Sequence, residues 1–208
     1  DKEPMLASFF YATILNHESL ECALSFHLAN KLDSLTLPAI AVREIILQAF
    51  REDSSITGYS CQDIRAVVDR DPVCSRYSIP LLYFKGYQAL QAYRVAHWLW
   101  NQGRESLALF FQNQISMVFN VDIHPAAKIG GGILVDHATG IVEGETVVVE
   151  DDVSIMQQVT LGGTGKEIGD RHPKIRRGVL MATGAKVLGN VEVGVGAKVA
   201  AGSVVLQD

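Results

Sequence analysis

Three histidines with acidic neighbours are the residues of this sequence best suited to acid–base chemistry. His124 and His137 lie in the strings VDIHPAA and VDHATG, and His172 lies in GDRHPK. A neutral imidazole is well suited to take a proton from a hydroxyl group near pH 7. A carboxylate on its other nitrogen, such as that of Asp122, would fix the tautomer and stabilise the imidazolium. His137 is therefore a candidate general base, and a capping or exposed position is the alternative for each histidine.

The elements that would position these histidines follow a period of six residues. Large aliphatic residues begin the successive steps: Ile123, Ile129, Val135, Ile141, Val147, Val153 and Val159, then Ile175, Met181, Val187, Val193, Val199 and Val205. This period predicts a parallel β-helix, in which three short strands make one triangular coil of about eighteen residues. Ordinary strands with accidental spacing are the alternative. In that register residue 140 would lie over Asp122, so Asp122 and His137 would have to meet around a bend.

The repeat is interrupted once, within GGTGKEIGDRHPK. The next aliphatic residue after Val159 is expected at position 165 but occurs at 175, which places ten extra residues outside the coil. This segment is rich in glycine and carries four polar side chains that could bind a ligand: Lys166, Asp170, Arg171 and His172. A regular solenoid that tolerates one polar excursion usually uses it for binding. A solvated bulge is the alternative.

The first half of the chain has few glycines and long amphipathic patterns, which predict helices. The apolar stripes place them near residues 6–14, 20–28, 42–50, 63–69, 81–100 and 104–119. The last of these is apolar almost all round, which is typical of a buried helix. The expected fold class is α+β, with an all-α domain over residues 1–120 and a β-helix over 121–208. The β-helix is expected to carry an extended loop at about 163–173.

Composition narrows the possible partners. The formal net charge of −5 gives no reason to expect a nucleic acid. The cysteines Cys22, Cys61 and Cys74 are odd in number and lack metal-type spacing, so we expect reduced thiols in a cytoplasmic protein. No run of 18 apolar residues is present, so no membrane span is expected. The missing initial Met and the abrupt end at Asp208 suggest a trimmed chain.

Several strings of this sequence resemble the serine O-acetyltransferases, a family of hexapeptide-repeat acyltransferases. They are FFQNQ, VDIHPAAKIG, VDHATGIVEGET, VTLGGTGK, GDRHPKI and, in the first half, DPVCSRYSIPLLYFKGYQALQAYR. The resemblance covers essentially the whole chain. It implies a left-handed β-helix and acetyl transfer from acetyl-CoA to L-serine, the first step of cysteine synthesis from serine. We expect direct transfer to serine, because no cysteine or serine nucleophile adjoins the histidine, and we expect no metal.

The resemblance implies roles for individual residues. His137 would be the general base and Asp122 its partner. Four residues would hold serine, the acids by its ammonium and the others by its carboxylate: Asp71, Asp136, Arg171 and His172. Acetyl-CoA would lie between neighbouring subunits, near Gly163, Thr183, Lys198 and Ala201. Where the family usually has Gly-Ala, this chain has Ala182-Thr183, which adds bulk near the expected CoA path.

The resemblance also implies partners. The family forms hexamers, as dimers of trimers joined through the helical domain, and L-cysteine inhibits it at the serine site. Cysteine synthase binds a C-terminal tail that would lie beyond Asp208. Three other functions remain open from the residues alone. They are acetylation of a sugar or xenobiotic, a metal-dependent lyase of the γ-carbonic anhydrase type using His124, His137 and His172, and a structural capping module.

Overall fold

The structure, a computed structural model, describes residues 3–165 and 168–207. The chain divides into two compact units, Asp1–Thr57 and Gly58–Asp208. The first unit contains η1 (Pro4–Leu6), α1 (Ala7–Phe10), η2 (Tyr11–Leu15), α2 (Leu20–Lys31) and α3 (Ala39–Glu52). Helix α2 begins at the side-chain cap of Ser19 and packs against α3, and both helices bury an aliphatic face. Helix α4 (Ser54–Arg70) continues from the first unit into the second.

The helices of the second unit are α5 (Ser78–Tyr83), α6 (Lys85–Asn101) and α7 (Glu105–Phe119). The single helix expected over residues 81–100 is wrong, because Phe84 adopts an extended backbone (φ −91°, ψ 103°) that ends α5 and lets α6 begin. Helix α6 is buried along most of its length and packs on α7. None of the helices in the described part of the chain is long and apolar enough to cross a membrane.

Helix α7 ends at Phe119 and is capped by Asn120, whose left-handed backbone (φ 58°, ψ 42°) turns the chain into the first strand. The change from helix to strand therefore falls at the junction expected from the sequence. The compact units divide at a different place, between residues 57 and 58. The division into a domain of residues 1–120 and a domain of residues 121–208 stays a prediction.

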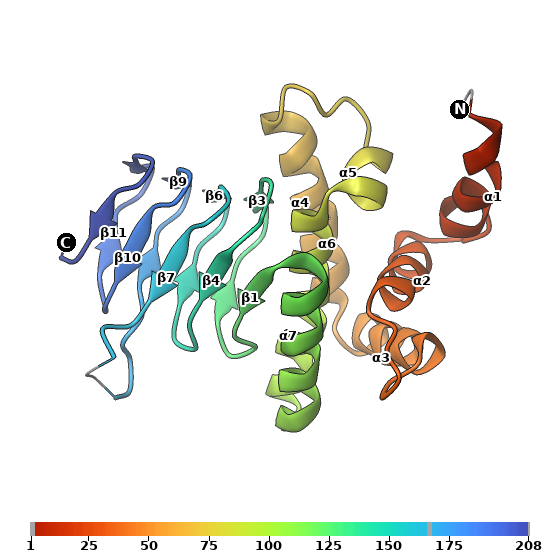
Figure 1. Cartoon of the computed structure of the whole chain (residues 1–208), viewed down its shortest axis with the longest axis horizontal. Helices are drawn as coiled ribbons and strands as arrows, with labels where there is room; N and C mark the ends of the chain where they lie inside the picture. Colours follow the sequence, from red (N-terminus) through yellow and green to blue (C-terminus); the bar gives the residue numbers. More distant parts are fainter. Residues whose placement is uncertain (1–2, 166–167, 208) are drawn as a thin grey trace. The chain divides into compact units, whose positions relative to one another are not determined.

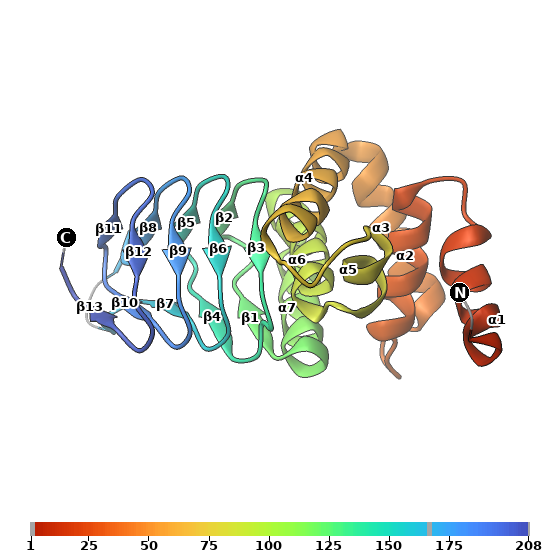
Figure 2. The ribbon, with the colours of Figure 1, turned by 90° about the horizontal axis from the view of Figure 1, so that it is seen from above.

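Within the described residues, short parallel strands form three sheets, seen as three ladders in Figure 2. Sheet A contains β1 (Val121–Ile123), β4 (Ile141–Glu143), β7 (Thr160–Gly162), β10 (Lys186–Leu188) and β13 (Val204–Val205). Sheet B contains β2 (Lys128–Ile129), β5 (Val148–Val149), β8 (Lys174–Ile175) and β11 (Glu192–Val193). Sheet C contains β3 (Leu134–Val135), β6 (Ser154–Ile155), β9 (Leu180–Met181) and β12 (Lys198–Val199). The expected class, helices followed by a left-handed parallel β-helix, is confirmed.

The chain passes from sheet to sheet at the edges of this prism. We call the turns between sheets C and A the C–A edge, and those between sheets A and B the A–B edge. The C–A edge comprises turns 136–140, 156–159, 182–185 and 200–203. The A–B edge comprises turns 124–127 and 144–147, the described residues 163–165 and 168–173 of the loop, and turn 189–191. In Figure 1, α7 leads into β1, and α6 contacts β1 and β3, so helices cover the first coil.

Two expected lengths are wrong: that of the first coil, expected at eighteen residues, and that of the loop, expected to add ten residues. The first coil contains twenty residues, since Val121 pairs with Ile141 and residue 134 pairs with residue 154. Asp122 therefore lies beside Val142 rather than beside residue 140. The coil that contains the loop has 26 residues, as the pairing of Val148 with Lys174 shows. The loop thus adds eight residues (26 − 18), not ten.

A phase slip explains the first error. Each six-residue step buries two side chains, such as those of Ile141 and Glu143 on β4, so every step has two inward positions. The structural equivalent of Ile123 in the next coil is Glu143, because these two residues pair. The series of aliphatic residues spaced by six instead continues at Ile141, which occupies the other inward position of the same strand. The two extra residues lie in turn 136–140, where His137 and Ala138 both have left-handed backbones (φ 55° and 63°). The slip thus coincides with the candidate base.

Candidate active site

His137 lies in the bulge that the two extra residues make in the C–A edge. Strand β3 ends at Val135, and the N–H of Asp136 still donates to the carbonyl of Ile155 (2.9 Å) before the chain turns outward. The His137 side chain is 71% exposed, and its Nε2 lies 3.6 Å from Asp136 Oδ2. The ring is therefore accessible to a ligand and has a carboxylate beside it. This geometry suits proton transfer.

A cavity of about 410 Å³ opens beside this bulge. It is lined by Asp71, Val73, Tyr83, Phe84, Lys85, Gly86, Val135, Asp136 and His137. Three of the predicted site residues, Asp71, Asp136 and His137, are thus brought together although 65 residues separate the first two. A small core of Val67, Cys74 and Leu134 packs the turn after α4 next to β3, and this packing places Asp71 at the cavity.

The C–A turns stack along the prism below the bulge. The Gln158 N–H donates to Thr139 O (2.8 Å), and the Gly202 N–H donates to Thr183 O (2.9 Å) in the last coils. Two residues predicted to bind CoA, Thr183 and Ala201, therefore share an edge with His137. Lys198 is exposed on β12 of sheet C, which leads to the same edge.

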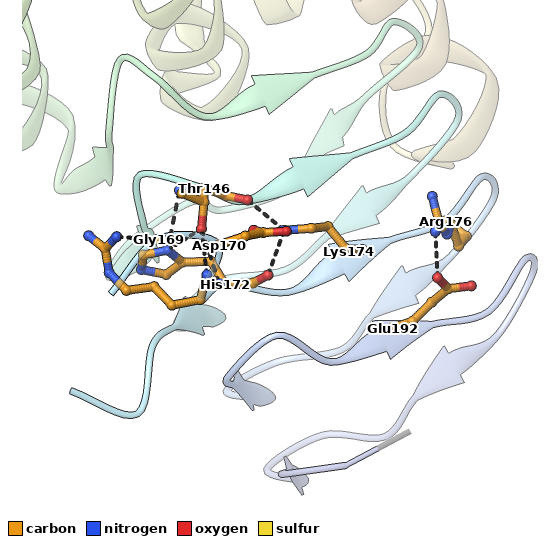
Figure 3. Close-up of polar contacts among 8 residues, drawn as sticks. Thr146, Gly169, Asp170, His172, Lys174, Arg176 and Glu192 are labelled. Carbon is orange, nitrogen blue, oxygen red and sulfur yellow. Dashed lines mark hydrogen bonds and ion pairs between the residues drawn. The ribbon is translucent and has the colours of Figure 1, made fainter. Parts of the chain in front are cut away.

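His172 lies at the A–B edge and is held by Thr146, as Figure 3 shows. The Thr146 hydroxyl accepts the backbone N–H groups of Arg171 and His172, each at 3.1 Å. Its own hydrogen is directed to His172 Nδ1 (2.8 Å), which also accepts the Thr146 N–H (3.2 Å). Nδ1 thus acts as an acceptor, which assigns the hydrogen of the neutral ring to Nε2. His172 can therefore donate a hydrogen bond through Nε2.

Burial is the main reason that the pKa of His172 lies below its ordinary value, and the Arg171 charge lowers it further. The ring is therefore neutral near pH 7. A side chain at Gly144 would collide with it, since a Cβ there would lie 2.0 Å from Nε2. Gly163, predicted to bind CoA, faces the same atom, and a Cβ on it would lie 3.5 Å away. Glycine at position 144 therefore leaves the space that the imidazole itself occupies, and His172 is only 7% exposed.

Arg171 pairs with Glu145 through Nη2 and Oε2 (2.6 Å) and donates through Nη1 to Gly169 O (3.0 Å). The hydrogen bond from Arg171 is the main cause of a lowered pKa at Glu145. In the same loop Asp170 pairs with Lys174 (2.6 Å). Lys166, the other charged residue predicted for this loop, lies outside the described residues.

Asp122, the predicted partner of His137, lies elsewhere. It is the middle residue of β1 in sheet A, and its Oδ1 accepts the Gln112 amide (2.7 Å). Among the described residues no hydrogen bond or ion pair joins Asp122 to His137. The carboxylate near the ring is that of Asp136, so the role of Asp122 stays a prediction.

The two edges are separated by the width of sheet A. Strand β4, which lies between them, has three residues at ~3.3 Å each, about 10 Å, and the turns on either side add to the separation. One serine molecule cannot span this distance, so a single chain does not present Arg171 and His172 to the ligand beside His137. The separation also weighs against a zinc site of three histidines. In the described part of the chain no group of three or more His, Cys, Asp or Glu residues is arranged to hold a metal ion.

Sequence reasoning missed three residues around these edges. Thr146 is an ordinary threonine of a turn, and only its contacts reveal that it orients His172. Lys85 lines the cavity but falls within an amphipathic pattern, where lysine is typical of a solvated face. Glu143 could have been recognised from the sequence. Once the strands are aligned as they pair in the structure, it is the one acid in a row of inward residues of sheet A: Ile123, Glu143, Leu161, Val187 and Val205.

Comparisons with known proteins agree on one family. A family model described as "Serine acetyltransferase, N-terminal" matches residues 1–92. The serine acetyltransferase of Escherichia coli K12 is 65% identical over 207 residues, which cover 100% of this chain and 76% of that protein. The crystal structure of the Vibrio cholerae serine acetyltransferase superposes with a TM-score of 0.97 at 67% identity, covering 99% of this chain and 80% of the other.

Solved serine acetyltransferases with bound ligands are also similar to this chain. One in complex with CoA has a TM-score of 0.95 at 60% identity, and one in complex with cysteine has 0.97 at 62%. The Neisseria gonorrhoeae enzyme in complex with serine has 0.97 at 51%. Each alignment covers 99% of this chain, and 85%, 80% and 85% of the other chain, respectively.

Proposed function

This chain belongs to the serine acetyltransferase family, and we propose that it moves the acetyl group of acetyl-CoA to the L-serine hydroxyl with His137 as general base. The observation that carries the assignment of residues is the cavity in which His137 lies with Asp71 and Asp136. It offers two carboxylates for an ammonium group next to an accessible imidazole. The finding that relatives bind CoA, cysteine and serine supports the same ligands here.

The proposed reaction is a direct transfer. His137 takes the hydroxyl proton of serine while the serine oxygen attacks the thioester carbonyl carbon. The tetrahedral intermediate then collapses, the C–S bond breaks, and the CoA thiolate takes the proton back from His137. General-base assistance supplies roughly 10²- to 10⁴-fold, and much of the remaining acceleration comes from holding both substrates together. Asp136, 3.6 Å from the ring, is placed to stabilise the imidazolium that forms.

The serine carboxylate is assigned to Arg171 and His172. A guanidinium and an Nε2–H donor suit a carboxylate, and the neutral His172 ring keeps that hydrogen at pH 7. Because these residues lie on the A–B edge, the site needs the A–B edge of one copy against the C–A edge of another. Helix α7 supports association, since it leaves Leu109, Met117 and Val118 exposed, the second of these by 72%.

Acetyl-CoA is assigned to the groove between such copies. Thr183 and Ala201 follow the bulge along the C–A edge, and Lys198 supplies a cation for phosphate. Gly163 leaves room next to His172. The Thr183 hydroxyl lies 3.4 Å from Gln157 Oε1. The Thr183 side chain, which is part of the extra bulk of Ala182-Thr183, is therefore held by the neighbouring coil.

Assembly and regulation follow the family. We propose a hexamer built as a dimer of trimers, inhibition by L-cysteine at the serine site, and cysteine synthase as a partner through a tail beyond Asp208. Cysteine carries the same ammonium and carboxylate groups as serine, so Asp71, Asp136, Arg171 and His172 would hold it in the same way. A cytoplasmic location agrees with the free thiols of Cys22, Cys61 and Cys74.

The function is tested by measuring release of the CoA thiol from acetyl-CoA. L-Serine should be the preferred acceptor over sugar and aminoglycoside hydroxyls, and L-cysteine should raise the KM for serine. Release that is equal with all acceptors, or that depends on added zinc, would contradict the proposal.

A further inference from the structure

The bulge that carries His137 cannot hold its shape unaided. His137 and Ala138 both have left-handed backbones, which cost roughly 1–2 kcal/mol for each residue other than glycine. The hydrogen bonds inside the turn are short-range, from Ala138 N to Asp136 O (2.6 Å) and from Thr139 N to His137 O (2.7 Å). Such a conformation persists only where the surrounding structure enforces it. Contacts from outside the turn must therefore contribute.

The first turn of α6 supplies one such contact, in addition to the backbone hydrogen bonds from the Gln158 N–H to Thr139 O and from the Gly140 N–H to Asn120 O (2.8 Å each). Gly86 lies so close to the end of β3 that a Cβ on it would be 2.1 Å from Val135 O. This close approach brings Lys85, the first residue of α6, next to the bulge. Lys85 Nζ donates to Thr139 Oγ1 (2.5 Å), and this hydroxyl lies 3.4 Å from the carbonyl oxygen of His137. A polar connection therefore runs from the helix to the backbone of the candidate base.

Helix stability does not explain a lysine at this position. A cation at a helix N-terminus opposes the macrodipole, at a cost of about 0.3–1 kcal/mol. The first turn of α6 contains no acid to offset that cost. Residues that break a local preference are typical of functional sites. Lys85 also lines the cavity shared by Asp71, Asp136 and His137.

We propose that Lys85 is a positioning residue, which holds the left-handed bulge through Thr139 and so aims the His137 imidazole at the hydroxyl to be acetylated. This inference rests on the proposed function. Lys85 acts on the base and not on CoA. Its removal therefore lowers kcat and leaves the KM for acetyl-CoA unchanged.

The test compares Lys85→Met, which keeps the aliphatic stem, with Lys85→Arg, which can still donate to Thr139. Lys85→Met should lower kcat about 10- to 100-fold, the effect of a small misplacement of a catalytic group. Lys85→Arg should recover most of the loss. Thr139→Val should lower kcat to a similar extent, and the double variant Lys85→Met with Thr139→Val should be no slower than Lys85→Met alone. Lys128→Met, at an exposed lysine of sheet B, is the matched control.

The outcomes separate the two claims. If the parent chain releases no CoA with serine, both the proposed function and the proposed role of Lys85 are wrong. If the parent chain is active and Lys85→Met keeps kcat within twofold, only the role of Lys85 is overturned. It is also overturned if the effects of Lys85→Met and Thr139→Val multiply. Thermal unfolding of each variant identifies a loss of folding, and Thr139→Val carries the test if Lys85→Met does not fold.

Discussion

The two edges of the prism hold their histidines in opposite ways. His137 is exposed on a strained two-residue bulge, whereas His172 is 7% exposed and fixed through Nδ1 by Thr146. A base must reach a hydroxyl, accept its proton and release it, which needs access and a free nitrogen. A binding group must present one donor in one direction, which needs a locked tautomer. The surroundings of each ring therefore indicate its role more clearly than its residue type does.

The largest expected effect comes from removing the exposed ring. His137→Ala should lower kcat roughly 10²- to 10⁴-fold, the usual contribution of a general base. The ligand groups on the A–B edge remain, so dissociation constants for serine and acetyl-CoA should change little. Single-turnover kinetics and calorimetric binding measure the two quantities separately. A variant that turns over at the parent rate would remove His137 from the mechanism.

The separation of the edges leads to the next prediction. Copies carrying His137→Ala and copies carrying Arg171→Ala should each be nearly inactive alone. Co-expressed at equal levels, they should regain about one quarter of the parent activity, because one site in four then combines an intact C–A edge with an intact A–B edge. Affinity purification through two different tags confirms mixed assembly. Mixed assemblies without regained activity would show that one chain supplies the whole site.

Much of the prism could be predicted from the sequence, because thirteen aliphatic residues follow one period. The phase of the repeat could not be predicted, since each six-residue step has two inward positions and both are usually aliphatic. Moving from one to the other at Ile141 keeps the period while the backbone gains two residues. The hydrophobic pattern therefore gives no sign of the bulge that carries His137, whereas the strand pairing in the structure does.

The candidate site could likewise be predicted only in part. Resemblance to the family named Asp71, Asp136 and His137, and the structure brings these three together at one cavity. Lys85 and Thr146 make hydrogen bonds to residues far apart from them in the chain, and such contacts leave no periodic pattern in the sequence. Asp122 shows the opposite problem, since a carboxylate suited to a histidine is bonded to Gln112 in this structure.

A smaller effect is expected from filling the space beside the locked ring. Gly144→Ala would place a Cβ 2.0 Å from His172 Nε2, so the ring must move. The Nε2–H group then no longer points at the ligand. Loss of one hydrogen bond to a charged ligand costs about 1.5–3 kcal/mol, so kcat/KM for serine should fall about 10- to 100-fold. The matched control is Gly194→Ala, since nothing lies within 4 Å of a Cβ there. Equal activity of the two variants would show that the orientation of His172 is unimportant.

The smallest effect on activity is expected inside sheet A, which lies between the two edges. Glu143 is 3% exposed, and burial raises its pKa to about 8. Within the described residues its Oε2 has no hydrogen-bond partner. The folded chain therefore keeps a proton that the unfolded chain loses above its ordinary pKa of 4.5. Because the folded state binds more protons between pH 4.5 and 8, stability should fall as the pH rises through this window.

Glu143→Gln removes this titration and keeps the shape of the side chain. At 1.36 kcal/mol per pKa unit, the variant should be more stable than the parent at pH 9 by at most about 5 kcal/mol. The difference should shrink as the pH falls towards 5. Denaturant unfolding at a fixed protein concentration across this range measures the slope, with exposed Glu44→Gln as the control. Parallel stability curves for the parent and Glu143→Gln would mean that Glu143 is ionised in the fold, whereas unchanged kcat would place the catalytic chemistry at the edges and not in the interior between them.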